Sequence, residues 1–336
     1  MLTTKTSLKT DAAGPAESDS TEQMTAKQRK LLARIERARS DRNTASADRP
    51  DEMFDYELPE VELVRKSLER EITGLTIENC EAASLKCLRS YFFRKYFTNR
   101  LAGAKINKVE RIGLYIAIKL ESEQFDTSHV LILSLGASGS PRWMPADSKE
   151  KLKNTEVVIK FSNGNKLLFV DPVGTGQLFL VPEDDIATHI PEVANYGSDP
   201  LSPVAWTEIG QRLLQQEREL KTLLKDDTFM VGIDTIYVDE ILFEAGLRYD
   251  RVANTLSSQE IRRLHRSLGS TLHNAMKYGG TSLPERPFTN PLGNTGGYSN
   301  HIQVWGRHDQ LSVRSRDPIK RVQYQGSWTY YCDTQI

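Results

Sequence analysis

One amphipathic helix opens the ordered part of the chain and constrains how the residues after it fold. It is predicted to begin in the polar stretch at 56–62, and apolar residues recur through it at helical spacing: Val61, Val64, Leu68 and Ile72. Residues at this spacing lie on one face of a helix, so we expect that face to be buried. Glu57 and Glu60 also suit an ordinary helix start, because carboxylates are favoured at the positive end of the helix dipole.

Short strand-like runs follow this helix at close spacing. They lie at 105–111, 115–120, 129–135, 156–161, 166–170 and 176–181. The pair Asn163-Gly164 separates two of them, and an Asn-Gly pair between apolar runs is a strong signal for a β-hairpin turn. Many short strands with turn signals between them predict a β-sandwich. We therefore expect an α+β fold whose N-terminal domain, 56–191, is a β-sandwich with a leading helix.

The chain becomes helical after a linker at 192–204 that is marked by glycine and proline. Helices are predicted at 206–224, 235–245 and 257–277. We assign them to a second domain at 205–300, and we assign 301–336 to a small hairpin region.

Composition narrows the class of protein further. The chain has 336 residues, enough for two domains with their own cores, and a formal net charge of −1. No apolar run reaches the length of a membrane-spanning helix, so no membrane partner is expected. Three cysteines do not make a disulfide framework, and an intracellular, reducing compartment is expected. The near-neutral charge gives no support to strong, salt-dependent phosphate binding.

Residues 1–55 are predicted to be a disordered extension with one basic amphipathic helix at 24–41. That helix could lie on DNA or on a protein partner, although a solvated tail is the simpler interpretation. An organelle transit peptide stays open as an alternative, but acidic residues from Asp11 onward count against it.

Several motifs occur in one order along both domains. They are 57–62, 74–77, 111–115, 134–139, 161–164, 171–172, 220–224, 231–246, 279–283, 293–298 and 303–307. In this order they resemble the formamidopyrimidine-DNA glycosylase and endonuclease VIII family over about residues 56–336. The resemblance implies base-excision repair of damaged DNA in the nucleus or another DNA-associated compartment, with duplex DNA as the partner.

The resemblance also implies which residues would carry the chemistry. Family members extrude a damaged nucleotide, and the amine of an N-terminal proline attacks its sugar. Glu57 falls on the family's general acid and Glu60 is retained, so both are candidate catalytic residues. Tyr56 falls on the proline, and its nitrogen would be an amine only if the chain were cut before it.

Candidate DNA contacts come from the helix–two-turns–helix motif of the family. A glycine turn followed by a helix N-terminus presents N–H groups to an anion, which points to Gly232 and Thr235. Lys221 is expected to contact phosphate, although an exposed helix lysine is the simpler interpretation without the motif. Arg307 lies at the entry to the family's zinc finger and is the fourth candidate.

Several family positions carry other residue types in this chain. The lysine that contacts the phosphate beside the lesion is replaced by Leu114, and the Gly-Asn pair of the two-turn motif falls on Asp234-Thr235. The three residues that fill the hole left by the flipped base fall on Ala137, Val173 and Thr175. All three are short and uncharged, so unstacking a base would lack its usual compensation.

The family's zinc finger is also altered. Its four ligands fall on Ser312, Ser315, Cys332 and Gln335. A structural zinc site needs four suitable ligands, so we expect no metal and no cofactor. The arginine at the finger tip is replaced by Ser327. A zincless hairpin could instead be held by packing of Val313 and 328–331.

Three interpretations of function follow. The first is a DNA-binding family member whose catalysis is lost or impaired. The second is an active bifunctional glycosylase and abasic-site lyase that uses Glu57 and a processed N-terminus at Tyr56. The third is a protein scaffold that has lost DNA binding and uses the basic helix at 24–41.

Overall fold

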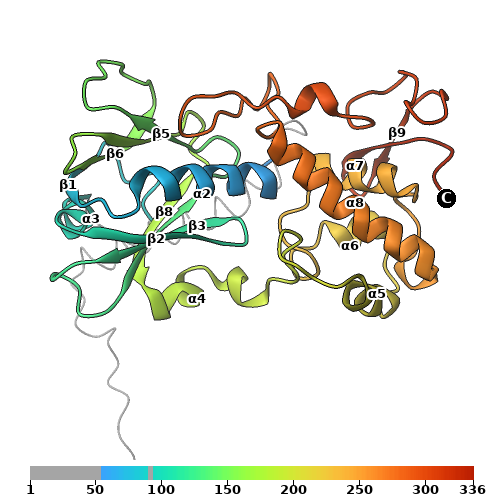
Figure 1. The fold of residues 1–336 in the computed structure, drawn as a ribbon, viewed down its shortest axis with the longest axis horizontal. Helices are drawn as coiled ribbons and strands as arrows, with labels where there is room; N and C mark the ends of the chain where they lie inside the picture. The colour runs from blue at the N-terminus through green and yellow to red at the C-terminus, as the bar shows by residue number, and fades with distance from the viewer. Residues whose placement is uncertain (1–53, 90–93) are drawn as a thin grey trace, which may run out of the picture. The chain divides into compact units, whose positions relative to one another are not determined.

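The leading helix, α2 (Leu58–Ile72), forms as its apolar spacing predicts. The computed structural model describes residues 54–89 and 94–336, so the helix expected at 24–41 lies outside the described residues. Four stripe residues of α2 are buried: Val61, Val64, Leu68 and Ile72. Pro59 lies in the first turn, where its missing N–H costs nothing. This buried face packs on β2 (Lys105–Ile112) and β3 (Tyr115–Glu121), as Figure 1 shows.

Two four-stranded antiparallel sheets form the sandwich. One has the strand order β2-β3-β4-β8 and the other β1-β6-β7-β5. The remaining strands are β1 (Ile77–Ala82), β4 (His129–Ser134), β5 (Ser140–Met144), β6 (Thr155–Phe161), β7 (Lys166–Val170) and β8 (Gln177–Pro182). All six predicted strands are present to within one residue at either end. The predicted α+β fold with an N-terminal sandwich is confirmed.

The β6–β7 hairpin shows why the turn signal and the apolar alternation predict this part of the fold. Gly164 in its turn has φ +85°, a conformation that glycine adopts without strain. Val157, Ile159 and Phe161 of β6 alternate inward and join the main core cluster. Val158, on the other face of β6, pairs with Leu168 of β7.

Three elements that precede β8 were not predicted. Strands β1 and β5 and helix α3 (Arg94–Leu101) carry too few apolar residues to stand out. The two strands form because neighbouring strands supply the pairing: β1 pairs with β6, and β5 pairs with β7. Helix α3 packs on β1. A short helix, α4 (Ile186–His189), and two 3₁₀ turns, η1 (Glu183–Asp185) and η2 (Pro191–Asn195), follow β8.

The helical half contains α5 (Trp206–Leu214), α6 (Leu220–Leu224), α7 (Thr235–Ala245) and α8 (Ser258–Lys277). The single helix expected at 206–224 is wrong. Residues 215–219 are all polar and offer no apolar face to bury, and the chain there pairs briefly with another loop through Glu219 and Val252. A 3₁₀ turn, η3 (Ala253–Thr255), leads towards α8, which begins with a capping box formed by Ser257 and Glu260.

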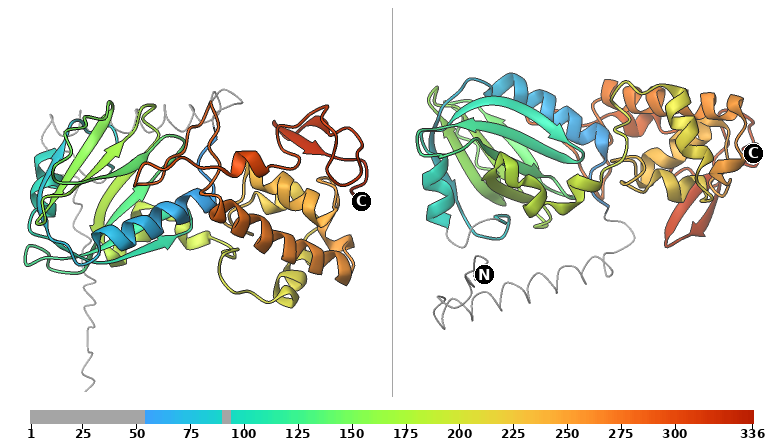
Figure 2. Two further views of the ribbon diagram at one scale, coloured as in Figure 1. Left: turned by 45° about the horizontal axis from the view of Figure 1, so that its top comes forward. Right: turned by 90° about the horizontal axis from the view of Figure 1, so that it is seen from below.

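The last residues form 3₁₀ turn η4 (Tyr298–His301) and a hairpin of β9 (Lys320–Tyr324) and β10 (Ser327–Tyr331). Strand β10 packs on α7 (Figure 2). All described residues belong to one compact unit, Asp51–Ile336. Within them, no helix is both long and apolar enough to cross a membrane.

Candidate active site

The backbone nitrogen of Tyr56 lies at the start of α2, and it is a peptide amide. Its N–H donates to the carbonyl oxygen of Gly136 at 2.8 Å. The lone pair of a peptide nitrogen is delocalised into the carbonyl, so this atom is not a nucleophile. The side chain is buried, and its hydroxyl donates to the carbonyl oxygen of Pro287 at 2.8 Å. Burial raises the pKa of this hydroxyl to about 12, so it stays neutral.

Arg286 contacts the residues that precede Tyr56 and fixes their position. No sequence motif predicted this role. Its Nη1 donates to the carbonyl oxygen of Asp55 at 2.6 Å. Its guanidinium carbon lies 4.4 Å from the ring centroid of Phe54 and 5.0 Å from that of Tyr56. The side chain is 2% exposed. A cation between two aromatic faces is favourable, and burial from water strengthens the attraction.

Glu57 caps the N-terminus of α7. Its carboxylate accepts from the backbone N–H groups of Asp234 at 2.7 Å, Ile236 at 2.9 Å and Tyr237 at 3.3 Å. The first N–H groups of a helix lack partners inside the helix, and the side chain of the N-cap residue Asp234 does not cap them. Burial, reinforced by the charge of Asp234, raises the pKa of Glu57 to about 8.

Glu60 lies one helical turn further on and is fully buried. Its Oε1 accepts from the N–H of Thr281 and the hydroxyl of Tyr237, both at 2.6 Å. Its Oε2 finds no hydrogen-bond partner among the described residues, and neither do Nε and Nη2 of Arg286. Burial raises the pKa of Glu60, and the positive charge of Arg286 opposes that shift. The structure therefore brings both predicted carboxylates and an unpredicted arginine together around Tyr56.

Lys221 does not have the position expected of a phosphate contact. It is 1% exposed, and its Nζ lies 2.7 Å from Oδ1 of Asp239 and 2.7 Å from Oγ1 of Thr329. A third hydrogen bond goes to the carbonyl oxygen of Trp328 at 3.2 Å. An ammonium has three donors, and all three are used inside the protein. The expected direct phosphate contact is therefore not available in this structure, where Lys221 joins α6 to α7 and β10.

Gly232 forms the tight turn that its motif predicts, with φ +77°. A Cβ at this position would lie 2.9 Å from Cβ of Leu58, so no other residue fits without a shift. Its N–H is not free for an anion, because it donates to Oδ1 of Asp227 at 2.8 Å. Thr235 is half-buried at the start of α7 with its hydroxyl 3.3 Å from Oδ1 of Asp234. Lys225 pairs with that same Asp234 oxygen at 2.8 Å.

The side chain of Arg307 forms hydrogen bonds with nearby residues of its own loop, 302–310. Its Nη1 donates to the carbonyl oxygen of Gln303 at 3.1 Å and to that of Ile302 at 3.3 Å, and its Nε donates to Gln310 at 3.0 Å. The four DNA-contact candidates are thus brought to one half of the molecule. Lys221 and Gly232 have their donors bonded within the protein, and Arg307 uses Nη1 and Nε in the same way.

We compared the sequence and the structure of this chain with those of known proteins. The profile of the formamidopyrimidine-DNA glycosylase N-terminal domain matches residues 56–178, and that of the H2TH domain of the same enzyme matches residues 196–286. The formamidopyrimidine-DNA glycosylase of Geobacillus kaustophilus is 32% identical over 82% of this chain and 97% of its own length. The chain belongs to the formamidopyrimidine-DNA glycosylase family.

Other members of the family match this chain over a similar share of its length. The Pelotomaculum thermopropionicum glycosylase is 32% identical over 83% of this chain and 98% of its own. A Lactococcus lactis Fpg solved with DNA containing an abasic site has a TM-score of 0.71 at 27% identity, covering 83% of this chain and 99% of that chain. The Thermus thermophilus protein has a TM-score of 0.69 at 31% identity, with coverages of 83% and 97%.

At the family's lysine position, Leu114 has a packing role. Its side chain contacts both large hydrophobic clusters, and its Cδ2 lies 3.0 Å from the place where a Cβ of Gly232 would be. The position therefore supplies apolar contact where the family supplies a cation.

The three positions that fill the hole left by the flipped base in the family lie on two loops. Ala137 is buried, and its N–H donates to Oγ1 of Thr175 at 3.0 Å. Val173 is 52% exposed, on a loop held by Asp171, whose carboxylate accepts from Gly174 at 3.0 Å. Of these three side chains Val173 is the exposed one, and it is short.

The four zinc-ligand positions lie together and are joined by hydrogen bonds. Oγ of Ser315 lies 3.2 Å from Sγ of Cys332, and the N–H of Cys332 donates to Gln335 at 2.8 Å. Burial raises the pKa of the Cys332 thiol, but hydrogen bonds with Ser315, Thr334 and Ser312 outweigh that effect, so the pKa is lowered. No group of three or more metal-ligating side chains occurs in residues 54–89 or 94–336. Val313, expected in the hairpin core, is 60% exposed.

Proposed function

We propose that this protein binds duplex DNA, including DNA with damaged bases, and that it lacks the base-excision chemistry of its family while the residues before Tyr56 remain attached. The observation that carries this proposal is the state of the Tyr56 nitrogen. It is a peptide amide, it is bonded to Gly136, and the chain that leads to it is clamped by Arg286.

Loss of the chemistry has three physical supports. Covalent attack on a sugar needs an activated amine, and an amide does not provide one. Leu114 cannot place a positive charge beside a phosphate. Glu57, the candidate general acid, has its carboxylate directed at the N-terminus of α7 by three backbone N–H groups.

DNA binding is supported by family membership and by the intact turn at Gly232, which keeps α7 in the place that the motif gives it. The relatives include Lactococcus lactis Fpg in complex with DNA containing an abasic site. Two of the candidate cationic contacts, Lys221 and Arg307, are bonded within the protein itself, and the net charge of the chain is −1. We therefore expect modest affinity and a shallow dependence on salt.

A processed enzyme is a second candidate, and one observation favours it. Glu57 and Glu60 remain buried beside Tyr56 with raised pKa values, as proton donors at neutral pH would require. Cleavage between Asp55 and Tyr56 would release an α-amine with a pKa of about 8, which can form a Schiff base.

Borohydride trapping on a duplex with an abasic site separates these functions. The full-length chain is incubated with the duplex and reductant, adducts are mapped by mass spectrometry, and binding is measured by fluorescence anisotropy. We expect binding without an adduct. An adduct on the Tyr56 nitrogen would establish the processed enzyme, and an adduct on a lysine would establish relocated chemistry. Absence of binding would leave a protein scaffold.

Two controls make a negative result meaningful. The Geobacillus kaustophilus relative should form an adduct under the same conditions. A chain that begins at residue 56 with Tyr56→Pro and Leu114→Lys restores the family's nucleophile and cation. We expect trapping to return in it, and the same truncation with Tyr56 and Leu114 kept shows whether the new terminus alone suffices.

A further inference from the structure

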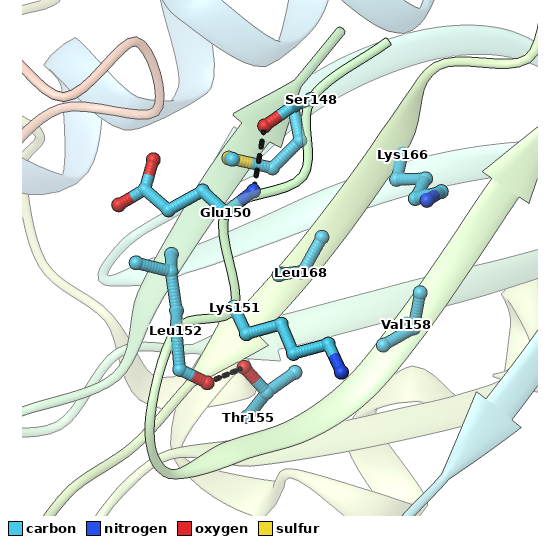
Figure 3. Close-up of a pocket in the computed structure, with 9 residues that line it drawn as sticks. Ser148, Glu150, Lys151, Leu152, Thr155, Val158, Lys166 and Leu168 are labelled. Atoms are coloured by element: carbon cyan, nitrogen blue, oxygen red, sulfur yellow. Dashed lines mark hydrogen bonds between the residues drawn. The ribbon is translucent and has the colours of Figure 1, made fainter. Parts of the chain in front are cut away.

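A pocket lies on the outer face of the β5–β7–β6 sheet, on the opposite side from the sandwich core. It has a volume of about 260 Å³, and the loop between β5 and β6 borders it. Figure 3 shows the loop residues Ser148 to Leu152 on one side and the strand residues Val158, Lys166 and Leu168 on the other. It shares no residue with the candidate active site.

The floor of this pocket is apolar. Val158 of β6 and Leu168 of β7 face each other across the strands in register, and Met144 of β5 lies beside them. Inner-face residues of the same strands, such as Ile159 and Leu167, belong to the main core cluster. The outer face of this sheet therefore has an apolar centre of its own, which the loop covers only in part.

The rim of the pocket carries positive charge that the protein does not neutralise. Lys166 lies directly opposite Lys160 in the β6–β7 register, and like charges in opposed positions repel. Lys160 is matched by Glu78, with Nζ and Oε1 3.0 Å apart. Neither Lys166 nor Lys151 forms an ion pair with any described residue, whereas both line the pocket.

The other polar groups at the pocket are already used. Oγ of Ser148 accepts from the N–H of Glu150 at 3.3 Å, and Thr155 donates to the carbonyl oxygen of Leu152 at 2.7 Å. These bonds shape the loop. The carboxylate of Glu150 points away from Leu168 and from both lysines in Figure 3. Figure 3 shows the two ammonium groups at different places on the rim, with no labelled carboxylate facing either of them, so an anion could reach one or the other.

We infer that this pocket binds a small amphipathic carboxylate, with its apolar part on Val158, Leu168 and Met144 and its carboxylate at Lys151 or Lys166. The volume sets the size, because drug-sized ligands occupy pockets of roughly 300–1,000 Å³ and this one takes a smaller molecule. The apolar floor gives affinity through burial, and the two lysines give selectivity for an anion.

Octanoate and octan-1-ol are the probes for the test, since they share an apolar chain and differ in charge. The full-length protein is labelled at its Ile, Leu, Val and Met methyl groups and titrated with each. We expect saturable methyl shifts at Met144, Leu152, Val158 and Leu168 with octanoate, and at least about tenfold weaker binding of octan-1-ol.

Charge reversal identifies the anion contact. The double variant Lys151→Glu, Lys166→Glu should weaken octanoate binding about tenfold or more and leave octan-1-ol binding unchanged. Lys105→Glu, an exposed position on β2 of the other sheet, is the matched control and should have no effect. Equal binding of the two probes, shifts outside the pocket, or octanoate affinity unaltered in the double variant would each overturn the inference.

Discussion

Nη1 of Arg286 lies 2.6 Å from the carbonyl oxygen of Asp55, and these two residues are 231 positions apart in the sequence. The contact fixes the backbone just before Tyr56, the residue that falls on the N-terminal proline of the family motif. Because the guanidinium also stacks on Phe54 and Tyr56, one side chain holds three consecutive residues.

Replacing Arg286 should therefore loosen this segment. For Arg286→Met we expect a loss of about 2–4 kcal/mol in the free energy of unfolding, since a buried charge-assisted hydrogen bond and two ring contacts disappear. Chemical denaturation measures the loss. Limited proteolysis with mass spectrometry should show faster cleavage near residues 54–56.

Arg248→Met is a control, because Arg248 also lies over two aromatic rings and pairs with Asp250, but its side chain is 34% exposed and lies away from Tyr56 in the sequence. It should not accelerate cleavage before Tyr56. Equal stability and equal cleavage in the Arg286 variant would show that the clamp contributes nothing.

Glu57 should make stability fall with rising pH. Its pKa is raised to about 8 in the folded protein, against about 4.3 in an unfolded chain, so the folded state holds more protons between these values. Stability contributed by the protonated form is complete below about pH 4 and is lost as pH rises through about 8. Glu240, with a pKa raised to about 7 by burial, acts in the same direction.

Glu57→Gln removes one titrating group, so the free energy of unfolding should fall less steeply between pH 5 and 8, by up to about 1.4 kcal/mol per pH unit. Urea denaturation at a series of pH values tests this. Parallel curves for the two proteins would mean that Glu57 is ionised throughout.

The Lys221–Asp239 pair should matter for stability. Lys221→Met leaves the Asp239 carboxylate buried without its cation, and breaking such a pair by removing one partner costs roughly 3–5 kcal/mol. The double variant Lys221→Met, Asp239→Leu removes both charges and should recover part of that loss.

Thermal or chemical denaturation of the two single variants and the double variant gives the coupling energy of the pair. DNA affinity is then compared only among variants that remain folded. If Lys221→Met were as stable as the parent but bound DNA less tightly, Lys221 would have the phosphate role that its motif implies.

The positions on which the family's zinc ligands fall should bind zinc when their side chains are thiols. Ser312, Ser315 and Gln335 already lie around Cys332, and Oγ of Ser315 is 3.2 Å from its sulfur. The triple variant Ser312→Cys, Ser315→Cys, Gln335→Cys completes four thiolates, the usual set of a structural zinc site. We expect a tetrahedral cobalt(II) spectrum and a raised melting temperature with zinc.

Adding Cys332→Ala to that triple variant leaves three thiols and should weaken metal binding strongly. If the triple variant bound no cobalt, the loop would have moved away from the ligand geometry of the family.

Much of the fold was predictable because local patterns and tertiary structure agree. The apolar spacing of α2, the Asn163-Gly164 turn and the left-handed glycine that ends α7 are each set by residues close together in the sequence, and tertiary packing agrees with them. Strands β1 and β5 were not predictable, since their pairing partners and not their own residues make them strands.

The candidate site likewise has features that the sequence predicted and features that only long-range contacts decided. Order and spacing of motifs identified the family and marked Tyr56, Glu57 and Glu60 from the sequence alone. The uses of these side chains were decided by residues about 180 to 230 positions away: Glu57 caps α7, and Tyr56 bonds to Pro287. Lys221 followed the motif in sequence but is buried in an ion pair that no motif contains.

The sequence by itself determined the family, the sandwich and the replacement of the family's proline by Tyr56, because periodicity and motifs are properties of neighbouring residues. Tertiary structure alone decided which polar groups are free. A donor or acceptor is available to a ligand only if no distant part of the chain satisfies it, and that depends on long-range packing, as Arg286 and Asp55 illustrate.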